Sequence, residues 1–190
     1  MRLNPEILES CYRAGVFPMG DRYGRIEFYT SDPRSILEFD SLHVSKSLAR
    51  VIRKGVYEVR VDSDFEGVIR ACARRRETWI NEEIIRGFVM LHERGKAHSV
   101  EAYKEDELVG GLYGVTLGGA FMGESMFSRM SDASKVCLVH LVERLKERGY
   151  VLLDCQIQND HLARLGAVEI SEREYLARLK VALRLERSFV

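Results

Sequence analysis

Two neighbouring stretches of this sequence place glycines inside what otherwise reads as β-sheet. They cover residues 110–115 and 121–128, and the second carries Gly123 directly before a lone carboxylate, Glu124. Glycine weakens the interior of a strand, and its presence there usually marks a bulge or a close approach by a ligand or another backbone. We therefore interpret the two stretches as the wall of a pocket.

The apolar pattern around this wall predicts a mixed α/β chain. Helices are expected near residues 4–15, 45–55, 63–76, 81–95, 132–148, 161–165 and 172–185. Strands are expected at 26–29, 57–61, 98–103, 108–115, 120–127 and 151–155, with turns at 15–20 and 30–34. The last strand is almost wholly apolar, as a strand covered on both faces would be, so parallel and antiparallel pairings are both expected. Residues 1–34 are too few to fold alone and are expected to pack on a main domain, residues 35–190.

Charge and cysteine usage exclude some classes of protein. The formal net charge is zero, which argues against a broadly basic nucleic-acid coat but allows a local basic patch. The four cysteines are scattered without metal-ligand spacing, so we expect reduced thiols and no metal. No stretch approaches the roughly 20 apolar residues that span a bilayer. A soluble, cytoplasmic protein without a membrane partner is the expectation.

Polar side chains at the end of the strand 151–155 are the first candidates for chemistry. Asp154 and Gln156 stand two residues apart, so on a regular strand their side chains point to one face and can address one site. Open α/β sheets bind ligands at this end of their strands. The alternative from local sequence is that Asp154 caps the next turn and Gln156 bonds the backbone.

Glu124 and Trp79 each have two interpretations. Glu124 lies among large apolar side chains, and burying a lone carboxylate is costly, so it is either ion-paired or functional. Trp79, the only tryptophan, follows three arginines in a polar loop and either packs in the core or stacks on a nucleic-acid base. His161 is an acid or base, or a packing residue.

Basic residues concentrate between positions 46 and 76. They are either a solvated helix face or a site for a nucleic-acid phosphate backbone, which needs only a handful of clustered cations. The candidates for binding are Arg50, Arg53, Lys54, Arg74, Arg75 and Arg76.

Several motifs, taken together and in order, resemble the leucyl/phenylalanyl-tRNA protein transferase family of bacteria. They are Tyr12-Arg13-x-Gly15-x-Phe17-Pro18, Ser31-Asp32-Pro33-Arg34, Thr78-Trp79-Ile80, Ala97-His98-Ser99-Val100-Glu101, the two glycine-bearing stretches, Ala133-Ser134-Lys135, Asp154-Cys155-Gln156 and His161-Leu162-x-x-Leu165-Gly166-Ala167. They cover nearly the whole chain.

The resemblance implies an acetyltransferase-like mixed sheet flanked by helices, with a small, truncated N-terminal portion. It implies transfer of Leu or Phe, and possibly Met, from aminoacyl-tRNA to proteins beginning with Lys or Arg, which marks them for degradation. An amine attacking an activated ester needs positioning and oxyanion stabilisation but no ATP, metal or other cofactor. A monomer is expected.

The resemblance also implies roles for individual residues. Gln156 would hydrogen-bond the attacking amine, Asp154 would orient it and help accept its proton, and Glu124 would bind an amino or hydroxyl group. Trp79 would pack on the terminal adenosine of the tRNA. The transferred side chain would contact a pocket formed by Leu112, Phe121, Leu141 and Leu145, and Ser125 is a further substrate-binding candidate.

Two departures and two rivals accompany the resemblance. Common members carry an additional N-terminal Gly-Gly-Asp-Leu stretch, and they have Trp-Trp-Ser-Pro-Asp-Pro-Arg where residues 28–34 read Phe-Tyr-Thr-Ser-Asp-Pro-Arg. Donor preference is therefore less defined than reaction type.

One rival is a small-molecule N-acyltransferase using acetyl-CoA, which would want a glycine-rich loop where residues 129–135 have no glycine. The other is a noncatalytic tRNA-binding module.

Overall fold

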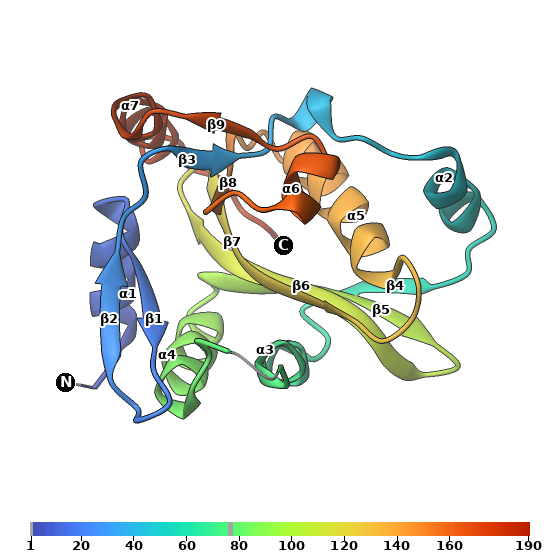
Figure 1. Ribbon diagram of the computed structural model, residues 1–190, viewed down its shortest axis with the longest axis horizontal. Coiled ribbons are helices and arrows are strands. Elements are labelled where there is room, and N and C mark those ends of the chain that lie inside the picture. The colour runs from blue at the N-terminus through green and yellow to red at the C-terminus, as the bar shows by residue number, and fades with distance from the viewer. Residues whose placement is uncertain (1, 76–77) are drawn as a thin grey trace.

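The computed structural model describes residues 2–75 and 78–190, and a seven-stranded mixed sheet forms its centre (Figure 1). The strands lie in the order β4 (Glu58–Val61), β5 (Ala97–Lys104), β6 (Glu107–Leu117), β7 (Ala120–Ser128), β8 (Leu152–Gln156), β3 (Arg34–Ile36) and β9 (Val168–Ile170). Within this sheet β7 and β8 are parallel, and all other neighbouring strands are antiparallel. The predicted mixture of pairings is confirmed.

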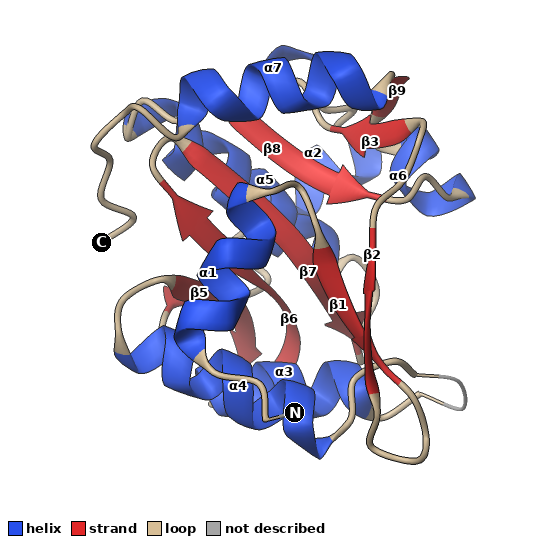
Figure 2. Cartoon of the chain, turned by 90° about the vertical axis from the view of Figure 1, so that its left-hand side faces the viewer, coloured by secondary structure: helices blue, strands red, loops and turns tan. Residues whose placement is uncertain are grey.

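The parallel pair β7–β8 is joined along only part of its length. Its register runs from Ala120 opposite Leu152 to Met122 opposite Asp154, whereas β7 continues to Ser128. Figure 2 shows the two strands diverging toward their carboxyl ends. The sheet therefore opens at this point, between its central strand β7 and the neighbouring strand β8.

Helices cover both faces of the sheet, each over its own apolar core. One core contains residues of α1 (Pro5–Arg13), α3 (Phe65–Ala73), α4 (Glu82–Glu93) and α7 (Glu172–Ala182). The other contains residues of α2 (Lys46–Arg53) and α5 (Ala133–Glu147), with Leu162 of α6 (Asp160–Arg164) packed against it. Figure 1 shows α3 and α4 on one side of the sheet and α5 on the other. The predicted α/β class, a mixed sheet flanked by helices, is confirmed.

Local signals identified the helices and the long strands correctly. Asn4, Ser45 and Asn81 each cap a helix by accepting from a backbone N–H two or three residues ahead, as such residues do at helix starts. The helix predicted from Ser63 instead begins after Asp64, whose carboxylate accepts from Gly67 N at 2.9 Å. All four cysteines are free thiols.

Three short strands were missed. Residues 15–20 were predicted as a turn, but β1 (Phe17–Gly20) pairs with β2 (Ile26–Tyr29) in a separate two-stranded sheet. The strands β3 and β9 have three residues each and pair with each other, and β3 also pairs with β8. Segments of three or four residues carry too little periodicity to identify, and β3 and β9 in addition become strands through partners more than 100 residues away.

The N-terminal elements α1 and β1 lie against α4. Both α1 and β1 contact that helix, and α1 also contacts β6. Arg34 already belongs to β3 of the large sheet. The division at residue 34 stays a prediction. None of the helices in the described part of the chain is long and apolar enough to cross a bilayer.

Candidate active site

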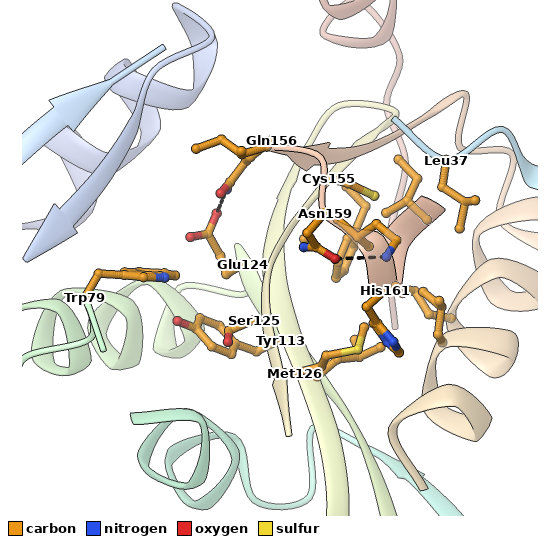
Figure 3. A pocket seen from close by; sticks show the side chains of 18 of the residues that line it. Leu37, Trp79, Tyr113, Glu124, Ser125, Met126, Cys155, Gln156, Asn159 and His161 are labelled. Carbon is orange, nitrogen blue, oxygen red and sulfur yellow. Dashed lines mark hydrogen bonds between the residues drawn. The ribbon is translucent and has the colours of Figure 1, made fainter. Parts of the chain in front are cut away.

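A cavity of about 370 Å³ lies where β7 and β8 diverge (Figure 3). Its lining comes from both faces of the sheet. Met19 and Trp79 pack on the core that contains α4, whereas Leu112 and Leu141 belong to the core that contains α5. The cavity therefore passes through the opening in the sheet. Its α5 side is mainly apolar but also carries Asn159 and His161, and Tyr113, Glu124 and Gln156 lie toward the other side.

A β-bulge in β7 places Glu124 in this cavity. Tyr113 pairs with Ser125 and the next residue, Gly114, pairs with Gly123, so Glu124 has no partner on β6. A Cβ atom on Gly114 would lie 2.4 Å from the carbonyl oxygen of Met122, which explains the glycine. Bulges re-aim side chains beside active sites. The predicted pocket wall is confirmed, and Gly114 and Gly123 lie at the bulge.

Glu124 uses one carboxyl oxygen for two hydrogen bonds. Its Oε1 accepts from the Tyr12 hydroxyl at 2.6 Å and from Nε2 of Gln156 at 2.7 Å (Figure 3 draws the second). Its Oε2 is buried and has no partner among the described residues. Burial raises the pKa of the carboxyl to about 8; the charge of Asp154 adds to the rise, and the Tyr12 and Gln156 bonds oppose it. At neutral pH a large share of Glu124 therefore holds a proton.

Asp154 lies behind the cavity, in a fully bonded ion pair. Arg34 donates to both of its oxygens, from Nε at 2.9 Å and from Nη2 at 2.6 Å. The Tyr175 hydroxyl and the backbone N–H of Gln156 each donate to it at 2.9 Å. Arg34 and Asp154 are 1% and 0% exposed, so solvent does not screen them. The carboxylate is therefore fixed, and it fixes the backbone of Gln156.

Gln156 turns the end of β8 toward Glu124. Its φ of +62° lies in the left-handed region, where a non-glycine residue is uncommon and is held by its surroundings. Ser31 Oγ donates to its carbonyl oxygen at 3.0 Å, and Asp154 accepts from its N–H. Because Nε2 donates to Glu124, the amide oxygen of Gln156 is the atom left to accept from a ligand.

Most of the predicted substrate-site residues meet in this cavity. Glu124 and Gln156 line it, and so do five of the six substrate-binding candidates: Trp79, Leu112, Phe121, Ser125 and Leu141. Leu145 is fully buried in the α5 core and is not part of the lining. Asp154 is also outside the lining and reaches the cavity only through Gln156.

The predicted basic patch divides into separate parts. Arg74 and Arg75 follow α3 and line a polar hollow of about 580 Å³ together with Ser128, Arg129 and His161. Arg75 and His161 also line the cavity, so the two spaces adjoin. The remaining described candidates, Arg50, Arg53 and Lys54, are exposed on or after α2, which packs on α5. Arg76 lies outside the described residues.

Sequence reasoning assigned no role to four residues that build the site. Tyr12 and Tyr113 contribute hydroxyl groups near Glu124, and Arg34 and Tyr175 hold Asp154. Tyr113 lies in the stretch interpreted as the pocket wall, and Tyr12 and Arg34 lie in motifs of the resemblance, but their individual contacts could not be predicted because each meets its partner through the tertiary fold. Among residues 2–75 and 78–190, no group of three His, Cys, Asp or Glu is placed to hold a metal ion.

Sequence comparison relates this chain to one family along its whole length. The family model described as leucyl/phenylalanyl-tRNA protein transferase matches residues 36–180, and the model of that family's N-terminal domain matches residues 1–32. A leucyl/phenylalanyl-tRNA protein transferase of Rubrobacter xylanophilus is 71% identical over 100% of both chains. One from Gloeobacter violaceus is 55% identical, over 98% of this chain and 97% of the relative.

Comparison of structures gives distant similarities. A functionally unknown conserved protein from Staphylococcus epidermidis aligns with 90% of this chain and 66% of its own, at a TM-score of 0.50 and 12% identity. A GCN5-related N-acetyltransferase-like protein from Streptococcus suis aligns with 87% of this chain and 64% of its own, at a TM-score of 0.43 and 12% identity. At such identities only the fold is compared.

Proposed function

Because the chain belongs to the leucyl/phenylalanyl-tRNA protein transferase family and is an aminoacyltransferase, we propose that it moves Leu or Phe from tRNA to proteins beginning with Lys or Arg. Met is a further donor to test. The product would be marked for degradation. We place the reaction in the cytoplasm and assign it to a monomer.

The two sides of the cavity fit the two ends of an aminoacyl ester. The apolar α5 side, with Leu112, Phe121 and Leu141, suits the side chain of the transferred amino acid. The α4 side, with Trp79, suits the terminal adenosine, because an indole ring stacks on any base. The ester bond between them would then lie in the opening between β7 and β8, beside Glu124 and Gln156.

The observation that carries this proposal is the Glu124–Gln156 hydrogen bond at the opening. It leaves the amide oxygen of Gln156 to accept from the attacking α-amino group and so to hold it against the ester. Asp154 and Arg34 act as positioning residues, since they fix Gln156 from behind. Such positioning is a large share of what an already activated ester requires.

The reaction balances without another reactant. A C–N bond forms between the α-amino nitrogen and the ester carbonyl carbon, and the bond from that carbon to the ribose oxygen breaks. The proton lost by the nitrogen ends on the ribose oxygen. The ester supplies the driving force, so ATP is not consumed.

The test measures transfer of radiolabelled Leu, Phe and Met from charged tRNAs to peptides that begin with Lys, Arg or Ala, without ATP. We expect transfer to the Lys and Arg peptides and little to the Ala peptide. Gln156→Ala should remove transfer and keep tRNA binding. Gln158→Ala is the matched control, because Gln158 follows the same strand but does not line the cavity. Equal transfer by both variants would refute the role of Gln156.

A further inference from the structure

The hydroxyl group of Tyr113 is a polar atom that the protein leaves without a partner. Tyr113 lies on β6 and is 0% exposed, yet its Oη forms no hydrogen bond with the described residues. The residue lines the cavity, and Figure 3 shows it on the same side as Trp79 and Ser125. Buried hydroxyl groups in proteins are nearly always bonded, so this exception calls for a physical reason.

Packing explains the ring of Tyr113 but not its hydroxyl. The ring meets Phe65 and Phe88 edge to face, at centroid distances of 5.7 and 5.6 Å. Phenylalanine would make the same contacts without burying a polar atom, and burying an unbonded hydroxyl costs stability. A bond formed only with bound substrate would account for the hydroxyl.

The chemistry of the site makes this hydroxyl a donor. Burial raises the pKa of Tyr113 well above its usual value, and the charge of Glu124 raises it further, so the phenol keeps its proton. Tyr113 pairs with Ser125 across the strands and adjoins the bulged Glu124. A neutral donor here suits an uncharged or developing negative oxygen at the ester, whereas the arginines of the polar hollow suit phosphates.

We propose that Tyr113 Oη donates a hydrogen bond to an oxygen of the aminoacylated terminal ribose of the bound tRNA. The acceptor is either the acyl carbonyl oxygen or the free ribose hydroxyl beside it. This inference rests on the proposed function, because it assumes that the ester occupies the opening between β7 and β8.

The test compares Tyr113→Phe with Tyr150→Phe. Tyr150 is a second buried tyrosine whose hydroxyl has no partner among the described residues, but it lies in the α5 core and outside the cavity lining. Tyr113→Phe should lower kcat/KM for transfer by about 100- to 1000-fold, the range for removing one donor at a reacting oxygen. Tyr150→Phe should leave kcat/KM within about twofold of the unmodified enzyme. Tyr113→Phe should keep or raise the melting temperature, because it removes no hydrogen bond of the free protein.

A tRNA ending in 2′-deoxyadenosine separates the two acceptors. If the ribose hydroxyl accepts, the loss caused by Tyr113→Phe should vanish with this tRNA, because the two changes remove the same bond. If the acyl oxygen accepts, the loss should persist and appear in kcat. Both results support the proposal. Unchanged transfer by Tyr113→Phe with normal tRNA, or a fall in its melting temperature that matches its loss of activity, would overturn it.

Trp79 gives a signal that does not depend on transfer. As the only tryptophan of the chain, it reports occupation of the cavity through its fluorescence. Suppose that the unmodified enzyme changes its fluorescence with Phe-tRNA and transfers Phe, and that the Tyr113→Phe variant transfers Phe at the same rate. That result would refute this inference and leave the proposed function intact. An unmodified enzyme that transfers from no aminoacyl-tRNA would refute the proposed function, and this inference with it.

Discussion

Arg34 holds both carboxylate oxygens of Asp154 in the interior, Nε to Oδ1 at 2.9 Å and Nη2 to Oδ2 at 2.6 Å. The guanidinium group of Arg34 also lies over the rings of Phe17 and Tyr175, at 4.8 and 4.3 Å from their centroids. A carboxylate so fully bonded is poorly placed to take a proton from the attacking amine. Its contribution is to hold Gln156 in its left-handed conformation.

Asp154→Asn should lower the free energy of unfolding by about 3–5 kcal/mol, because it leaves Arg34 buried and uncompensated. Urea denaturation measures this. Asp40→Asn is the matched control, because the carboxylate of Asp40 is 90% exposed and pairs with Lys146 at the surface. Breaking this exposed ion pair should change the free energy of unfolding little. At temperatures where Asp154→Asn stays folded, transfer should fall more than tRNA affinity. Equal losses in both would show that Asp154 acts on tRNA binding.

Glu124→Gln should change how stability depends on pH. The carboxyl titrates near its ordinary 4.5 in the unfolded chain and near 8 in the folded protein. Between these pH values the folded protein keeps a proton that the unfolded chain has lost. The contribution of Glu124 to the free energy of unfolding is therefore fully present below about pH 4.5 and is lost as the pH rises toward 8. Replacement by Gln should remove this loss and raise stability at pH 8 relative to pH 5 by roughly 3–4 kcal/mol. Urea titrations at both pH values decide it, and parallel pH dependences of the two proteins would contradict it.

Leu141→Ala should shift donor preference, because it enlarges the apolar side of the cavity. A change of this size in a hydrophobic pocket alters discrimination between donors by about 1–3 kcal/mol. The measurement is the ratio of kcat/KM for Phe-tRNA to that for Leu-tRNA. Leu145→Ala is the matched control, since Leu145 lies one turn further along α5 and outside the lining. A comparable shift in the control would place Leu145 at the donor site after all.

Reversing Arg74 and Arg75 together to Glu should weaken tRNA binding and flatten its salt dependence, by about one unit of slope for each phosphate that is no longer neutralised. Binding is measured by titration at several salt concentrations. Arg50→Glu with Arg53→Glu tests the α2 part of the predicted patch in the same way. Arg173→Glu with Lys180→Glu, both exposed on α7, controls for net charge. If all three double variants showed the same dependence of tRNA affinity on salt, Arg74 and Arg75 would not contact tRNA phosphates.

The sequence predicted the parts of this molecule that local rules determine. Helices followed from caps such as Asn81 and from their apolar faces, and the glycines of β6 and β7 pointed to the bulge and the cavity. The predicted family is confirmed. The strands β3 and β9 could not be predicted, because they exist through pairing with distant segments, and β1 was missed because its four residues show no strand alternation.

Side-chain directions at the site were the least predictable feature. Asp154 and Gln156 were expected to share a face, but the left-handed backbone at Gln156 breaks the alternation of the strand, so Gln156 bonds Glu124 while Asp154 bonds Arg34. Arg34 itself is a lone arginine in a turn-like segment. Only the fold places it in the interior, where its charge is neutralised.

Arg34 forms hydrogen bonds with Asp154, 120 positions later in the chain, and with Tyr175, 141 positions later. Contacts of such long sequence separation are slow to form, because most of the chain must be ordered before they are made. We expect the site to be completed last, after the ribosome has released nearly the whole polypeptide. Unfinished or truncated chains would then lack the fixed Gln156, so an incomplete copy of this enzyme would be unable to modify the proteins around it.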